Sequence, residues 1–222
     1  MFDKLQRYLG LAATALLCLT MSSLVNAHPH GWIDLRMRLV VDDDGQLTGL
    51  HQSWRMDPFY SLVVLEELNQ VGGDGGLDAA LDQLGSEIRD NLVAFGYYTE
   101  LTLAGETLSF DEVNDYTVLE RGGRVEFVFL LPLAEPQPLA GQTLRYQVFD
   151  PTYYIEMVHE EENREPADDA LLVGGALACE TRIWPPDPDP EKVMQAAMLD
   201  VDDAAEPGLG RHFAETGEVT CR

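Results

Sequence analysis

Residues 32–41 alternate strictly between apolar and polar side chains, as expected for a strand with one buried face. An Asp-Asp-Asp-Gly turn signal follows at 42–45, and a second strand is expected over 47–56, so the two form a β-hairpin. If the turn is centred near Asp44, residues whose numbers sum to about 88 face each other. The start of the first strand, with His30 and Trp32, then lies beside Asp57 at the end of the second.

Two helices are expected directly after the hairpin. Asp57-Pro58 is a typical N-cap with proline at the first helical position, which predicts a helix to about residue 70. The residues expected to form its apolar face are Phe59, Leu62, Val63 and Leu65. A glycine-rich break precedes a second helix over 77–95, whose apolar residues recur at spacings of three and four.

The remainder of the chain has mainly strand patterns. Strands are expected over 97–103, 106–110, 114–120, 124–131 and 144–149. A proline-punctuated loop is expected over 132–141, an acidic loop over 160–170, an extended linker over 184–190, a short helix over 191–199 and then a polar tail. A hairpin, two helices and a run of strands predict an α+β fold with a mainly antiparallel sheet.

Residues 1–27 have the three-part pattern of a secretory signal peptide. Lys4 and Arg7 precede an apolar stretch over 9–21, and Val25-Asn26-Ala27 closes it with small residues. The stretch is shorter than the roughly 20 residues of a membrane span. We therefore expect an exported protein that is not inserted in the membrane after cleavage. Its main α+β domain would cover 28–158, and an acidic C-terminal extension over 159–222 would pack on it.

Cleavage would remove Cys18 and leave two cysteines, Cys179 and Cys221. An even pair in an oxidising compartment favours one disulfide bond. Such a bond would tie the C-terminus back to an earlier part of the chain. It would stabilise the fold by a few kcal/mol, because the cross-link lowers the conformational entropy of the unfolded chain. A thiolate metal site or redox pair needs closer spacing than this.

Composition excludes some partners. The chain has 14 Lys and Arg against 39 Asp and Glu, a net charge of −25. A surface of this sign repels phosphate backbones and anionic lipid headgroups, so we expect no nucleic-acid binding. It attracts cations, although a salt-adapted surface is the favoured explanation of the net charge as a whole. The motifs of serine hydrolases, P-loop proteins, zinc proteases and dinucleotide-binding domains are absent, so no enzyme activity is expected.

The new N-terminus after cleavage is the strongest chemical candidate. His28 would carry both a free α-amine and an imidazole, a ready chelate for Cu, Ni or Zn, and His30 supplies a second imidazole. A square-planar site that uses the amide of the second residue is excluded, because Pro29 has no N–H. Asp57 can cap the helix, orient an imidazole or act as a ligand. The alternative is a frayed terminus with two solvated histidines.

Other candidates are weaker. Asp150-Pro151 is a strong turn former, but with Tyr153 and Tyr154 it can also line a polar pocket. His51 is expected too far along its strand to share the site. His159 lies in an acidic run and is expected to be solvated.

Three segments together resemble a known family: Ala27-His28-Pro29-His30-Gly31-Trp32-Ile33-Asp34, Trp54-Arg55-Met56-Asp57-Pro58-Phe59 and Phe149-Asp150-Pro151-Thr152-Tyr153-Tyr154. The chain resembles the bacterial domain of unknown function numbered one thousand and seven, often labelled the periplasmic component of an uncharacterised ABC-type transport system. The resemblance is strong over residues 28–154 and weaker beyond. This chain departs from the family pattern at Gly31, where a bulky residue is more usual.

The usual genomic neighbour of that family is a nickel/cobalt-type membrane permease. The resemblance therefore implies a periplasmic accessory protein that binds a divalent transition metal ion (Ni, Co, Zn or Cu) and assists an inner-membrane metal permease. The alternative is a non-metal interaction or solute-binding module of a transport system. The expected metal-site residues are His28, His30, Asp57 and Asp150, and the expected pocket residues are Trp32, Trp54 and Tyr153.

Overall fold

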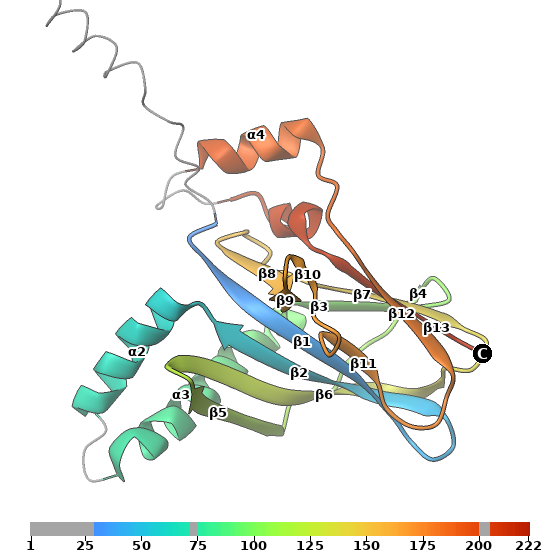
Figure 1. The fold of residues 1–222 in the computed structure, drawn as a ribbon, viewed down its shortest axis with the longest axis horizontal. Helices are drawn as coiled ribbons and strands as arrows, with labels where there is room; N and C mark the ends of the chain where they lie inside the picture. Colours follow the sequence, from blue (N-terminus) through green and yellow to red (C-terminus); the bar gives the residue numbers. More distant parts are fainter. Residues whose placement is uncertain (1–28, 72–74, 200–204) are drawn as a thin grey trace, which may run out of the picture.

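The structure is a computed structural model that describes residues 29–71, 75–199 and 205–222. Two β-sheets pack against each other, and helices α2 and α3 lie together at one end of them (Figure 1). The observed fold is α+β with mainly antiparallel strands, as the sequence predicts. The expected signal peptide at 1–27 lies outside the described residues.

The N-terminal hairpin is confirmed. Strands β1 (Gly31–Val41) and β2 (Gln46–Met56) are antiparallel, with Ile33 opposite Met56. This register is within one residue of the one expected for a turn at Asp44. Every second residue of β1 is buried, because side chains alternate between the two faces of a strand and one face of β1 packs against the core.

The first sheet contains six strands in the order β11-β1-β2-β6-β5, with β8 also beside β1. The remaining strands are β5 (Asp115–Arg121), β6 (Arg124–Pro138), β8 (Ile155–His159) and β11 (Leu171–Val173). Strands β8 and β11 run parallel to β1, and the other pairs are antiparallel.

The expected loop over 132–141 is wrong, because β6 continues to Pro138 and pairs with the start of β2. The register shifts between Leu47 and Gly49 of β2, which face Gln137 and Pro132. Prolines are tolerated in strands at such irregular positions, since fewer ladder hydrogen bonds are needed there.

The second sheet has the order β12-β13-β7-β3-β4, all antiparallel. Its strands are β3 (Thr99–Leu103), β4 (Glu106–Thr107), β7 (Thr143–Val148), β12 (Cys179–Trp184) and β13 (Thr216–Cys221). The expected polar tail is therefore wrong, because the C-terminal segment forms a strand between β12 and β7. Within the expected acidic loop, β9 (Glu161–Glu162) and β10 (Glu165–Pro166) form a small hairpin.

The expected disulfide is confirmed. Cys179 and Cys221 face each other in register across β12 and β13, and their sulfurs are bonded at 2.04 Å. Strands that follow residue 158 thus complete both sheets begun by the first part of the chain.

The α-helices of the described residues are α2 (Pro58–Val71), α3 (Gly76–Val93) and α4 (Pro190–Met198). Short 3₁₀ helices cover Gly96–Tyr98 and Leu209–Phe213. Helix α3 approaches β5 closely at Gly85, where an added Cβ would lie 3.2 Å from the Tyr116 and Val118 side chains. This contact covers the end of the first sheet that the second sheet leaves open.

Of the four residues expected to form the apolar face of α2, Leu65 packs against the core and the other three do not. Phe59 is 76% and Leu62 is 62% exposed, and Val63 is also exposed, whereas Ser61 is buried. Nearly every residue of the first two turns is apolar, so hydrophobic periodicity cannot select the buried side. The buried side carries Ser61, whose hydroxyl donates to Met56 O and accepts from Val125 N. On the same side Val64, Leu65 and Leu68 pack against the core.

The core lies between the two sheets. Its largest fully buried side chains come from both sheets and are Tyr146, Phe127, Phe129, Leu35, Met37, Leu39, Leu47, Leu50, Leu101, Leu131, Leu139 and Leu144. The opposite face of the first sheet carries charged residues, and that outer face leads directly to the start of α2.

Candidate functional site

The start of β1 is fixed against the loop that contains Asp150. The backbone N–H of His30 donates to the carbonyl oxygen of Tyr154 at 2.9 Å, and the two rings are 4.5 Å apart. His28 lies outside the described residues. His30 therefore enters the fold at a defined point, beside the first turn of α2.

Asp57 adjoins this point, as the hairpin register predicts. Its backbone N–H donates to Trp32 O at 3.1 Å. Its Oδ1 atom accepts from the N–H groups of Phe59 and Tyr60, both at 2.9 Å. The carboxylate is thus the N-cap of α2, and it is buried.

The second oxygen of Asp57 points at Gly31. A Cβ added to Gly31 would lie 2.9 Å from Asp57 Oδ2, closer than real Cβ contacts allow. The carboxylate of Asp57 can therefore lie this close to the strand because residue 31 is a glycine. Among the described residues, no hydrogen-bond donor reaches Oδ2. This oxygen lies against Gly31, the residue that follows His30 in the sequence.

Asp150 has a different role. Its Oδ1 accepts from Thr152 N at 2.9 Å and Thr152 Oγ1 at 2.8 Å, and its Oδ2 accepts from Ile155 N at 3.1 Å. These bonds hold a tight loop in which Tyr153 has a left-handed backbone, with φ of 59°. Because its carboxylate is occupied in this way, Asp150 positions the loop that binds His30.

The three expected pocket residues are not brought together. Trp54 is 2% exposed and faces the core, where its ring contacts Phe129. Trp32 is 43% exposed and points from the other face of the same sheet, since strand side chains alternate. Tyr153 stacks on Phe213 at 4.0 Å in a separate small cluster.

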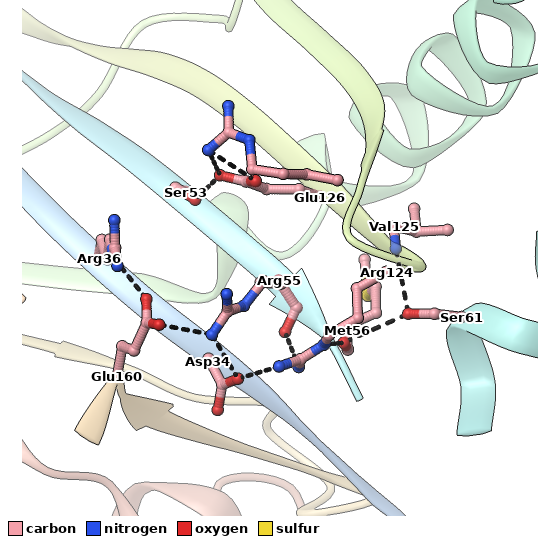
Figure 2. Close-up of polar contacts among 11 residues, drawn as sticks. Asp34, Arg36, Ser53, Arg55, Met56, Ser61, Arg124, Val125, Glu126 and Glu160 are labelled. Atoms are coloured by element: carbon pink, nitrogen blue, oxygen red, sulfur yellow. Dashed lines mark hydrogen bonds and ion pairs between the residues drawn. The ribbon is translucent and has the colours of Figure 1, made fainter. Parts of the chain in front are cut away.

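A chain of ion pairs crosses the outer face of the first sheet (Figure 2). We call it the ionic ladder: Arg36, Glu160, Arg55, Asp34 and Arg124. Glu160 binds both Arg36 and Arg55, the latter at 2.5 Å. Asp34 in turn lies 3.5 Å from Arg55 and 2.6 Å from Arg124. The ladder therefore joins β1, β2, β6 and the segment after β8.

The ladder ends at the start of α2. Arg124 donates from Nε to Met56 O at 2.5 Å and from Nη2 to Arg55 O at 3.0 Å. These bonds hold the last residues of β2 (Figure 2). Asp57 is the next residue in the sequence. Arg124 thus holds the end of the strand that directly precedes Asp57. In the sequence, the alternation of Asp34 and Arg36 indicates only a polar strand face.

The expectation that His159 is solvated is wrong. Its side chain is 2% exposed, with Nε2 2.6 Å from the Tyr146 hydroxyl and Nδ1 2.7 Å from Glu215 Oε2. The same Glu215 oxygen accepts the His159 backbone N–H. Burial, and then Glu215, raise the pKa of Tyr146. The signal in the sequence is alternation, because His159 shares the core side of β8 with Met157.

Within the described ranges, no group of three or more His, Cys, Asp or Glu side chains is arranged to hold a metal ion. No helix in those same ranges is long and apolar enough to cross a membrane.

Comparisons with known proteins give a family without a known function. The family described as "Protein of unknown function (DUF1007)" matches residues 13–221. An uncharacterised protein of Haemophilus influenzae is 28% identical over 209 residues, which cover 93% of this chain and 97% of that protein. No solved structure matches the chain.

Proposed function

Because the chain belongs to the DUF1007 family, whose description states no activity, we propose its function from the candidate site. We propose a periplasmic accessory protein that binds a divalent transition metal ion at its N-terminus and delivers it to an inner-membrane permease. The metal would be bound first by His28 and His30, after cleavage of the leader.

The observation that supports this proposal is the position of Asp57 Oδ2 against Gly31. A carboxylate oxygen with no donor among the described residues lies against Gly31, which is one residue after His30 and three after His28 in the sequence. An α-amine, two imidazoles and a carboxylate suit Ni, Co, Zn and Cu, and the general affinity order favours Cu. Asp57 acts either as a ligand or as the acceptor that orients the His30 ring.

The proposal gives the remaining predicted residues supporting roles. Asp150 holds the loop whose Tyr154 carbonyl anchors His30. Trp32 is exposed, and its backbone carbonyl accepts the N–H of the cap residue Asp57. Permease delivery rests on the family resemblance alone.

The experiment compares variants of a protein that begins at His28. Calorimetric titration with Ni, Co, Zn and Cu should show tight stoichiometric binding, weakened at least about 100-fold when His28 and His30 are both replaced by alanine. Asp57→Asn should weaken binding about 10-fold while preserving the helix, because asparagine is an equally good N-cap. His51→Ala is the matched control, since His51 is exposed on β2, and its affinity should not change. Unchanged affinity in the double variant would overturn the site.

A second candidate function, an interaction module, is favoured by the exposed apolar side of α2. Phe59, Tyr60, Leu62 and Val63 all face solvent, and Glu66 and Glu67 follow on the same helix. Such a surface fits a partner protein with an apolar contact area and a basic rim.

Replacement of Phe59 and Leu62 by serine separates the two candidates. The interaction module predicts that this variant no longer captures the permease, and that wild-type capture is equal with and without a chelator. Metal delivery predicts that capture depends on bound metal and on His28 and His30. Neither serine should lower stability by more than about 0.5 kcal/mol, because both side chains are exposed.

A further inference from the structure

A groove of about 260 Å³ lies on the outer face of the first sheet, beside the ionic ladder. Its walls come from β1, β2, β5, β6 and β11, together with Asp169, two residues before β11. Most of the side chains that line it are polar: Arg36, Arg38, His51, Ser53, Arg121, Glu126 and Asp169. The groove is independent of the proposed metal site, which adjoins the opposite end of the ladder.

The carboxylates that line the groove already have cationic partners. Glu126 accepts the Ser53 hydroxyl at 2.6 Å and pairs with Arg121 at 3.1 Å. Asp169 pairs with Arg36 at 3.1 Å, and Arg36 also binds Glu160 of the ladder. The negative charge in the lining is therefore compensated.

Arg38 is the exception among the basic residues of the lining. It forms no ion pair with any carboxylate that the structure describes, and it is exposed at the groove. Its direct cross-strand partner is His51. Directly opposed strand residues have Cβ atoms roughly 5 Å apart, so an anion bound by Arg38 would also lie beside the His51 ring.

The distribution of arginine supports the same assignment. The chain has a net charge of −25, yet Arg36, Arg38, Arg55, Arg121 and Arg124 all lie on this one face. The ladder uses Arg55 and Arg124 for internal pairs, which leaves Arg38 as the guanidinium available to a ligand. Guanidinium groups bind carboxylate and phosphate oxygens in a two-point fork.

We propose that this groove binds a small oxyanion, either a carboxylate or a phosphate, with Arg38 as the main contact and His51 and Arg121 at its sides. The volume of the groove limits the size of the ligand, because pockets for drug-sized ligands begin at roughly 300 Å³. The ligand is thus a compact anion rather than a cofactor.

The test uses the full mature chain in chelator, so that no metal contributes. Inorganic phosphate, succinate and citrate are titrated separately at constant ionic strength, and binding is followed by calorimetry and by backbone amide shifts. At least one probe should bind and shift the amides of residues 36–38 and 51–53. The identity of the tightest probe separates a phosphate ligand from a carboxylate one.

Arg38→Gln should weaken that binding at least about 10-fold without changing the melting temperature, because the side chain is exposed. Arg145→Gln is the matched control: this exposed arginine lies on the second sheet and pairs with Glu218. Its affinity should equal that of the wild type. Equal losses in both variants, or no saturable binding of any probe, would overturn the proposal. Tighter binding of polyglutamate than of every small probe would also overturn the assignment to a compact ligand.

Discussion

Arg124 is the residue on which the geometry of the candidate site depends most. It is largely buried and binds one carboxylate and two backbone carbonyls at the junction of β2 and α2. If Arg124 is lost, the largely buried carboxylate of Asp34 loses its nearer cationic partner. A buried charge without a partner destabilises the folded state. Arg55 at 3.5 Å is the other cation that binds Asp34.

Arg124→Gln should therefore lower the free energy of unfolding by about 3 kcal/mol. Urea denaturation followed by circular dichroism measures the change. Arg145→Gln again serves as the control, because an exposed ion pair contributes less than about 1 kcal/mol. Similar losses in the two variants would show that the ladder does not hold the strand end.

Glu156 gives a prediction about pH. Burial, and then the neighbouring Glu215 carboxylate, raise the pKa of Glu156 above its ordinary value of 4.5. A raised pKa in the folded state means that ionisation of this group costs stability as the pH rises through that pKa. Glutamine removes the charge and can still accept the hydrogen bond from Tyr153.

Glu156→Gln should therefore be more stable than the wild type at pH 7. The gain should shrink as the pH falls and disappear below about pH 4, where the glutamate is protonated in both states. Urea midpoints at several pH values measure it, with exposed Glu106→Gln as the control. A gain that is independent of pH would contradict the assigned cause.

At the residue scale, the sequence predicted the Asp57 cap, because Asp-Pro before an apolar run has one dominant structural meaning. It did not predict the burial of His159. The neighbouring glutamates suggested that His159 is exposed to solvent. Its actual hydrogen-bond partners, Tyr146 and Glu215, lie farther along the chain in both directions.

At the element scale, the hairpin and both early helices were predictable because each depends on local patterns. The central position of β13 was not. Its core-facing residues are Gly217, Val219 and Cys221, which make a weak hydrophobic signal. Its partners β7 and β12 are remote in sequence, so only the assembled sheet explains the strand.

The disulfide stabilises this C-terminal strand against β12. Its two cysteines are 42 residues apart, and a loop of that length contributes about 4 kcal/mol by the chain-entropy estimate. Replacement of both cysteines by alanine should lower the free energy of unfolding by about 2–5 kcal/mol in urea. Wild-type protein unfolded with a reductant should lose a similar amount. A loss below about 0.5 kcal/mol would contradict this role.

At the scale of the whole molecule, both sheets combine strands that are far apart in the sequence. Strands β8 and β11 pair in parallel with β1, more than 100 residues earlier. Sequence patterns cannot reveal such pairings, because each requires a long connection to be closed first. The same assembly brings the Tyr154 carbonyl to His30 and gathers the arginines on one face of an acidic protein.

The central claim is that the mature N-terminus binds a metal through its α-amine and histidines. The most direct measurement is a calorimetric titration of Cu and Ni into two proteins, one that begins at His28 and one with a single extra N-terminal glycine. The account predicts tight one-to-one binding by the first and at least about 10-fold weaker binding by the second, because the added residue separates the amine from the imidazole. Equal, weak binding by both proteins would contradict it, since only the acidic surface would then bind metal.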